Sequence, residues 1–327
     1  MKRFLEAQQL DYTKALNEIR SGRKLSHWIW YIFPQIQGLG FSYMSQHYAI
    51  KDLNEAVSYL DHDVLGPRLR EITTALLSVE NRSALDILGS PDDKKVRSCM
   101  TLFDYICPMD IFGQVLDKYF HGSRCTRTVK ALADQMSISS ALSYIGADPN
   151  DFHLTDSMFY KSTLSSIHGI DHVYRTMIGC ALIGQQIQKP REALLSFCGA
   201  YIHDLARKND GVEDEHGANA ALHYFNRFSE LWDKYKLTEE ERRQVKEAVR
   251  QHSIKESILK DEEGYDVMAI LKDADALDRC RIGDLDPRYL RYRESRHLVR
   301  FIENIYSKTA GHYNDISFTD FVAGTNS

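Results

Sequence analysis

Apolar residues in this sequence recur every three or four positions, and alternating apolar–polar runs long enough for a β-strand are nearly absent. A spacing of three to four places apolar side chains on one face of an α-helix, whereas a strand needs a spacing of two. The best strand candidate is the aromatic run at 28–33, and periodicity leaves it equally compatible with a buried helical turn. The sequence therefore predicts a mainly α-helical protein.

Both halves of the chain carry the helical pattern. Its clearest stretches are residues 3–22, 52–66, 66–79, 90–103, 168–187, 192–208, 237–254 and 265–281. Two of them begin with capping signals: Ser90 before Pro91, and Thr238 with Glu241 three positions later. These residues predict where the helices start.

A chain of 327 residues is long enough for two domains, each able to bury its own core. The polar segment 146–152, GADPNDF, has the turn residues of a linker. We therefore expect two helical domains, residues 1–145 and 153–327, with a boundary as early as Ala131 as the alternative.

The composition indicates a folded protein of a reducing compartment. Its apolar fraction is 43%, no stretch reaches the roughly 18 apolar residues of a membrane helix, and the first residues lack the apolar run of a secretory signal. The six cysteines are scattered without a CxxC pair, which favours reduced thiols over disulfides. We expect a cytoplasmic protein with no membrane partner.

The net charge of −5 arises in the second half of the chain. Residues 1–150 carry 17 basic and 17 acidic side chains, and the remainder carries 24 basic and 29 acidic ones. Domains that bind nucleic acid are normally basic, so no nucleic-acid partner is expected. The sequence leaves the oligomeric state open.

Side chains that bind metal ions gather in the second half, where nine of the 13 histidines fall. His203 and Asp204 follow the apolar stretch LLSFCGAYI, and Asp275 lies within VMAILKDADALD. A charged side chain so near a core must be paired or bound to a metal ion. Imidazole and carboxylate groups from separate helices can meet inside a bundle and hold a divalent ion.

The order of these residues resembles the HD phosphohydrolase superfamily. The matching phrases, within about residues 155–290, are SIHGIDHVYRT, YIHDLARKNDGVEDEHGANAA and DADALDRCRIGD, which are similar to a bacterial HD subgroup. The resemblance implies a helical bundle, metal-dependent phosphohydrolysis and a four-ligand set at His172, His203, Asp204 and Asp275. It also implies a divalent cofactor, one or two ions of Mn, Fe, Mg, Co or Ni.

Three further histidines need separate interpretation. His216 and His252 lie where HD proteins with two or three metals have additional ligands, so we expect them to bind a second ion; the alternative for His216 is a surface-loop residue or a helix cap. His168 precedes His172 by four residues, hence we expect it on the same helix face. It is a candidate metal ligand, phosphate contact or support for a ligand.

Catalysis would need a bridging carboxylate and a nearby cation. With two ions, Asp204 is the expected bridge. Arg207 follows it by three residues, so we expect it on the same side of that helix, where it would offset charge on a phosphate. Weaker candidates, each of which is alternatively a solvated surface charge, are Lys208, Arg175, Arg279 and Arg281.

The first half holds no metal-ligand set and no phosphate-binding glycine loop, but it contains the aromatic segment KLSHWIWYIFPQIQGLG. An aromatic pocket with a few polar groups is a usual way to hold a small ligand. The alternative is that the tryptophans are core and the polar residues cap helices. The candidate ligand-binding residues are His27, Trp28, Trp30, Gln35, Lys94, Ser98 and Thr101.

The first 128 or so residues resemble the bacterial family called domain of unknown function 1810. The matching phrases include RFLEAQ, SHWIWYIFPQIQGLG, YLDHDVLGPRL and SPDDKKVRSCMTLF. The resemblance implies a compact, mainly helical domain with no established chemistry. Cys125 stands where the family phrase G-x-x-D-x-x-T has an acidic residue, so no role of that residue carries over.

The expected function is metal-dependent hydrolysis of a phosphoester or phosphoanhydride in a small, nucleotide-like substrate. The N-terminal domain would bind a ligand or act as an accessory. Two alternatives stay open: a nucleotide-binding sensor with an inactive HD domain, and a di-iron oxygenase of the HD type.

Overall fold

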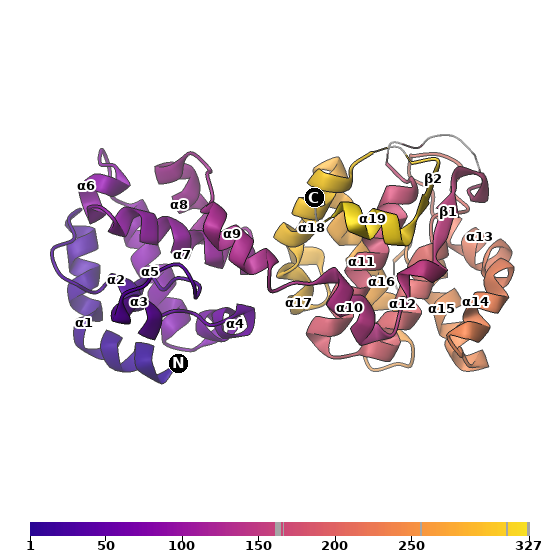
Figure 1. Cartoon of the computed structure of the whole chain (residues 1–327), viewed down its shortest axis with the longest axis horizontal. Coiled ribbons are helices and arrows are strands. Elements are labelled where there is room, and N and C mark those ends of the chain that lie inside the picture. Colours follow the sequence, from indigo (N-terminus) through magenta and orange to yellow (C-terminus); the bar gives the residue numbers. More distant parts are fainter. Residues whose placement is uncertain (161–164, 166, 256, 312, 326–327) are drawn as a thin grey trace. The chain divides into compact units, whose positions relative to one another are not determined.

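The computed structural model describes residues 1–160, 165, 167–255, 257–311 and 313–325. It divides into two compact units, an N-terminal unit of Met1–Met136 and a C-terminal unit of Ser137–Ser327. Both are built almost entirely from helices, as Figure 1 shows. The prediction of a mainly α-helical protein is therefore confirmed. No described helix combines the length and apolar character needed to span a bilayer.

The N-terminal unit contains helices that pack around the long helix α7. Its elements are α1 (Lys2–Arg20), α2 (Ile29–Ile32), α3 (Tyr43–His47), α4 (Leu53–Asp61), α5 (Leu65–Leu77), α6 (Ala84–Leu88), α7 (Asp92–Ile106), α8 (Ile111–Phe120) and α9 (Thr126–Ala133). α7 contacts α4, α6, α8 and α9, while α1 contacts α2 and α5. The aromatic run at 28–33 forms the short helix α2, not a strand.

Two predicted helix boundaries in this unit differ from the structure. The stretch 52–66 does not form one helix, because α4 ends at Asp61 and Gly66 already belongs to α5. A Cβ atom at Gly66 would lie 2.0 Å from the carbonyl oxygen of Leu60, an approach that only glycine permits. At α7 the N-cap is Pro91 rather than Ser90, and its helix start has no side-chain cap.

A buried carboxylate organises the segment between α1 and α2. Glu18 accepts hydrogen bonds from the backbone N–H groups of Leu25 and Ser26 and from the indole Nε1 of Trp28, at 2.8, 3.1 and 2.8 Å. Burial alone would raise the pKa of Glu18, but these bonds and the Ser26 hydroxyl lower it to about 2. The carboxylate thereby holds an otherwise irregular segment against the core.

The C-terminal unit combines α-helices with short 3-10 turns (η) and one two-stranded sheet. Its elements are α10 (Ile138–Ile145), η1 (Pro149–Asp151), β1 (His153–Thr155), η2 (Asp156–Met158), α11 (Ile170–Ile187), α12 (Pro190–Ile202), α13 (His216–His223), η3 (Phe225–Phe228), α14 (Ser229–Lys234), α15 (Glu239–Gln251), α16 (Tyr265–Leu277), η4 (Asp278–Ile282), η5 (Pro287–Tyr289), α17 (Arg293–Arg296), α18 (Val299–Thr309), β2 (Asp315–Ser317) and α19 (Phe318–Gly324). The strands pair antiparallel, with Leu154 opposite Ile316.

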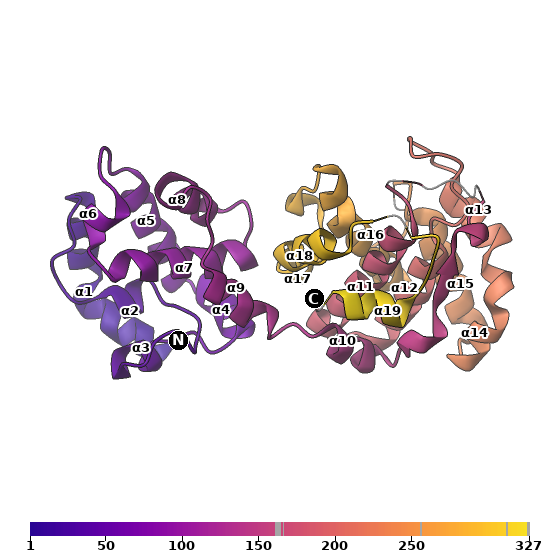
Figure 2. The ribbon, with the colours of Figure 1, turned by 45° about the horizontal axis from the view of Figure 1, so that its top comes forward.

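The core of the C-terminal unit is formed by four packed helices, α11, α12, α15 and α16. Helices α11, α12 and α16 contact one another, and α15 packs on α12, α13 and α16 (Figure 2). The hairpin of α11 and α12 is tight, because a Cβ at Gly184 would lie 2.0 Å from that of Ala193. At α15 the capping box of Thr238 and Glu241 forms as predicted.

The predicted linker, residues 146–152, belongs to the C-terminal unit. Helix α10, which precedes it, packs on α11 and α12. Phe152 is fully buried and lies edge-on to the rings of Phe197 and Tyr201. The units therefore divide between Met136 and Ser137, earlier than the predicted linker, because an apolar helix and a buried aromatic tie this segment to the C-terminal helices.

Candidate metal centre

The candidate ligands come from the ends and first turns of five segments in the C-terminal unit. His172 lies in the first turn of α11, and His203 and Asp204 lie in the turn that ends α12. His252 caps the C-terminus of α15, and Asp275 lies near the end of α16. His216, which falls outside the helical stretches expected from the sequence, is the first residue of α13.

Four of these side chains form a first ligand group. The Nε2 atoms of His172 and His203 lie 3.2 Å apart. Nε2 of His172 lies 3.3 Å from Oδ2 of Asp204 and 3.4 Å from Oδ1 of Asp275. This group contains the four residues that the sequence predicts as the primary ligand set, brought together from α11, the turn that ends α12, and α16.

A second ligand group lies on the other side of Asp204. Its other oxygen, Oδ1, is 3.1 Å from Nε2 of His216 and 3.5 Å from Nε2 of His252. Those two Nε2 atoms are 2.8 Å apart. One carboxylate thus directs one oxygen toward each group, which is the arrangement of a ligand shared by two ions.

The opposite nitrogen of each imidazole is held by an acceptor. Nδ1 of His203 lies 2.7 Å from the carbonyl oxygen of Ala200, and Nδ1 of His252 lies 2.7 Å from that of Val249. Because a carbonyl oxygen only accepts, Nδ1 donates in both rings. In the neutral form the Nε2 lone pair then faces the cluster, as a metal ligand requires.

The charges of the cluster fit a cation. Burial lowers the pKa of His203 to about 3, so this ring is neutral and presents a lone pair to Nε2 of His172. Burial also lowers the pKa of His172, but its three carboxylate neighbours outweigh that effect and raise it to about 10. Positive charge is therefore favoured at this point. A divalent ion bound by these nitrogen and oxygen atoms would supply the same positive charge in place of the proton on His172.

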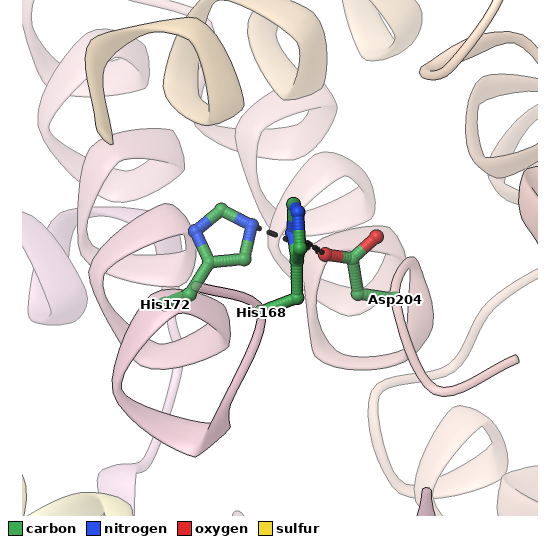
Figure 3. Close-up of side chains that lie close together, drawn as sticks. All are labelled: His168, His172 and Asp204. Atoms are coloured by element: carbon green, nitrogen blue, oxygen red, sulfur yellow. Dashed lines mark hydrogen bonds and ion pairs between the residues drawn. The ribbon is translucent and has the colours of Figure 1, made fainter. Parts of the chain in front are cut away.

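Figure 3 shows His168, His172 and Asp204 converging. Nδ1 of His168 lies 3.0 Å from Oδ2 of Asp204. His168 does not share a helix face with His172, because it lies in a bend and α11 begins only after Gly169. Burial would raise the pKa of Asp204, yet the surrounding histidines hold it well below its usual range, so the 2% exposed carboxylate is ionised.

The predicted cations fall in different surroundings. Arg207 does not share a helix side with Asp204 as expected, because α12 ends at Ile202 and Arg207 follows the turn after it; its NH1 atom lies 3.9 Å from Oδ1 of Asp204. Lys208 lines the same pocket as Arg207 and His168. In contrast, Arg279 pairs with Asp284 on the surface, and Arg175 is buried.

A pocket of about 240 Å³ opens beside the cluster. Its lining includes Asp156, Phe159, Arg207 and Tyr313, of which only Arg207 was a sequence candidate. Asp156 lies in η2, Phe159 directly follows η2, and Tyr313 lies in the segment before β2. Two strands of three residues bring these distant segments together, and strands so short carry no periodic signal.

The N-terminal candidates do not form one set in the structure. Trp28 is 1% exposed with its indole N–H bound to Glu18, and Ser98 and Thr101 are buried with hydrogen-bond partners inside the unit. These three side chains stabilise the fold. His27 and Lys94 are exposed, and Trp30 and Gln35 are partly exposed. The ammonium nitrogen of Lys95 lies over the Trp30 ring, 4.6 Å from its centroid.

The fold and the two ligand groups define a helical protein with a candidate centre for two metal ions. Residues 169–280 match the family model described as HD domain, and residues 1–132 match that described as protein of unknown function (DUF1810). The chain therefore joins a DUF1810 domain to an HD domain, the fusion that the sequence motifs predicted. The HD domain places the C-terminal unit in a superfamily of metal-dependent phosphohydrolases.

One solved structure is similar to part of the chain. It is the crystal structure of the conserved hypothetical protein Rv1873 from Mycobacterium tuberculosis, which is 46% identical over 40% of this chain and 95% of that chain, with a TM-score of 0.40. No similar curated protein was found.

Proposed function

We propose that the C-terminal unit hydrolyses a phosphoester or phosphoanhydride in a small, nucleotide-like molecule. Two divalent ions would be held by the two ligand groups, from among Mn, Fe, Mg, Co and Ni. The observation that supports this most strongly is Asp204, whose two oxygens face two separate sets of imidazole nitrogens. Metal centres that share a carboxylate are suited to in-line displacement at phosphorus.

A divalent ion at this centre lowers the pKa of a water molecule and neutralises charge on phosphate oxygens. The protein contributes the surroundings. Asp204 is ionised and almost fully buried, so it holds cations without competition from solvent. Arg207 extends a guanidinium group toward the same carboxylate and can donate to a phosphate oxygen. His168 stands between the pocket and Asp204, where it can hydrogen-bond a reacting oxygen.

The pocket beside the cluster suits a small phosphorylated substrate. Its volume of about 240 Å³ lies just below the range of typical ligand sites, roughly 300 to 1,000 Å³, which limits it to a small molecule or part of one. Arg207 and Lys208 provide positive charge, while Phe159 and Tyr313 provide aromatic surface. Asp156 can accept hydrogen bonds from sugar hydroxyl groups. This combination supports a nucleotide-like molecule over a purely apolar phosphate ester.

For the N-terminal unit we propose an accessory ligand-binding role. The side chains open to a ligand are His27, Trp30, Gln35 and Lys94, since the other candidates are occupied internally. The partly exposed indole of Trp30, with the ammonium group of Lys95 4.6 Å from its ring, favours an anionic or aromatic small molecule.

The test is phosphate release from a panel of nucleotides, cyclic nucleotides and sugar phosphates with added Mn²⁺. Wild type is compared with Asp204→Ala and with Asp261→Ala, a matched change at an exposed aspartate. We expect release by wild type and Asp261→Ala, and none by Asp204→Ala with helical circular dichroism retained. Equal turnover by Asp204→Ala would rule out the proposal. Nucleotide binding without release would indicate a sensor, and oxygen uptake with iron would indicate an oxygenase.

A further inference from the structure

His172 differs from the other ligand histidines in what holds its second nitrogen. His203 and His252 use backbone carbonyls near helix ends, where these groups have no helical partner. His172 lies in the first turn of α11, and the carbonyl three residues before it, that of Gly169, already accepts from the N–H of Val173. A side chain must therefore provide the acceptor.

That acceptor is Asp278, at the junction of α16 and η4. Its Oδ2 lies 2.8 Å from Nδ1 of His172, and both side chains are 0% exposed. Asp278 is thus on the far side of the imidazole from the ligand group, more than one hundred residues away along the chain. Among the described residues, Asp278 is not part of the lining of the pocket beside the cluster, so it acts on the metal centre through His172.

Two arginines fix the orientation of Asp278. The buried guanidinium of Arg175 donates to Oδ1 at 2.5 Å and to Oδ2 at 3.1 Å, and it also donates to Asp171 at 2.8 Å. NH1 of Arg281 lies 3.6 Å from Oδ2. A two-pronged bond from a planar guanidinium sets the plane of a carboxylate. The network therefore aims one oxygen at His172.

Stability alone is a poor explanation for this network. Desolvating a carboxylate and a guanidinium costs several kcal/mol per ion, and well-packed apolar residues of similar volume are often as stable. A carboxylate behind a metal-binding imidazole has two other effects: it selects the tautomer and raises the basicity of the coordinating nitrogen. Both act at Nε2 of His172, which is a member of the first ligand group.

We infer that Asp278, held by Arg175, is the positioning residue that keeps Nε2 of His172 directed at the metal centre. This inference rests on the proposed function, because it assigns the first ligand group to an ion. Removing the carboxylate is expected to weaken metal binding even when the fold is intact. Changes behind a ligand histidine typically reduce metal affinity about 10- to 100-fold.

The experiment is a calorimetric titration of the metal-free full chain with Mn²⁺, repeated with Co²⁺ to record its visible absorption. Asp278→Asn is compared with Asp273→Asn, a change at another fully buried carboxylate of α16. Asp273 holds the backbone of Arg291 and Tyr292 and the hydroxyl of Ser295, away from the ligands. It controls for the loss of a buried charge.

We expect Asp278→Asn to bind Mn²⁺ about 10- to 100-fold more weakly, with an altered Co²⁺ spectrum. Asp273→Asn should lose thermal stability but keep wild-type affinity and spectrum. If Asp278→Asn does not fold, Arg175→Lys takes its place, and weaker Mn²⁺ binding is again expected. Wild-type affinity in the folded variant would overturn the positioning role alone. Failure of the wild-type chain itself to bind Mn²⁺ would overturn the proposed function as well.

Discussion

Replacing Gly217 by alanine tests the second ligand group directly. Gly217 follows His216 in the first turn of α13, which packs on α15. A Cβ atom there would lie 2.5 Å from the carbonyl oxygen of Val249 and 2.9 Å from Nδ1 of His252. Ordinary contact begins near 3.4 Å, and neither neighbour is the far end of a flexible side chain. Helix α13 must therefore move from α15 by about 0.9 Å.

A shift of this size decides whether the second group can hold an ion. Metal–ligand distances tolerate only about 0.2 Å, so a displacement of about 0.9 Å breaks the geometry between His216 and His252. The first group contains no residue of α13 and should survive. Overpacking of this kind costs about 1–3 kcal/mol of folding free energy, which leaves an ordinary domain folded.

The assay is titration of the metal-free full chain with Mn²⁺, together with urea unfolding. We expect two ions per chain for wild type and one for Gly217→Ala, with a reduced free energy of unfolding. Gly324→Ala is the control, since among the described residues nothing lies within 4 Å of its added Cβ. The reasoning is refuted if Gly217→Ala binds a second ion as tightly as wild type does.

Three further predictions use other parts of the chain. The pKa of Glu18 is about 2 in the folded protein and 4.5 ordinarily, so its ionised carboxylate stabilises the fold above about pH 4.5, and this contribution is lost as the pH falls toward 2. We therefore expect the free energy of unfolding of Glu18→Gln to fall less than that of wild type between pH 5 and pH 3, as measured by urea unfolding followed by tryptophan fluorescence. An equal fall in both proteins would contradict this. Thr238→Ala removes the hydroxyl that accepts from the backbone N–H of Glu241 at the start of α15. It should lower the free energy of unfolding by about 1 kcal/mol in a thermal melt, whereas no change would show that the cap is dispensable. Arg207→Ala should lower kcat/KM measured at saturating Mn²⁺ at least about tenfold, the value of a charged hydrogen bond; unchanged kinetics would exclude the phosphate contact.

The sequence predicted the helical class because apolar spacing is a local property that survives into the fold. The resemblance to the HD superfamily also led us to expect His172, His203, Asp204 and Asp275 in one group, and the structure brings these side chains together. Their order along the chain reflects ligands from successive helices, which a bundle brings together in its interior.

Other features depend on contacts that no local pattern records. His168 was expected on the face of a helix, but that helix begins only at Ile170, and a bend rather than a helical turn brings His168 to Asp204. The requirement for glycine at positions 66 and 217 is visible only in the structure, where a backbone carbonyl of another segment lies against each of them. The pocket lining needs the pairing of β1 with β2, more than 150 residues apart in the chain.

The backbone contacts of His203 and His252 link ion binding to the order of helix ends. Their Nδ1 acceptors, the carbonyls of Ala200 and Val249, belong to the last turns of α12 and α15. When either turn frays, the imidazole loses the partner that selects its coordinating nitrogen. By thermodynamic linkage, an ion at one hundred times its Kd then raises the free energy of opening by about 2.7 kcal/mol. Amide protons of these two turns should accordingly exchange with solvent about one hundred times more slowly in the ion-bound protein.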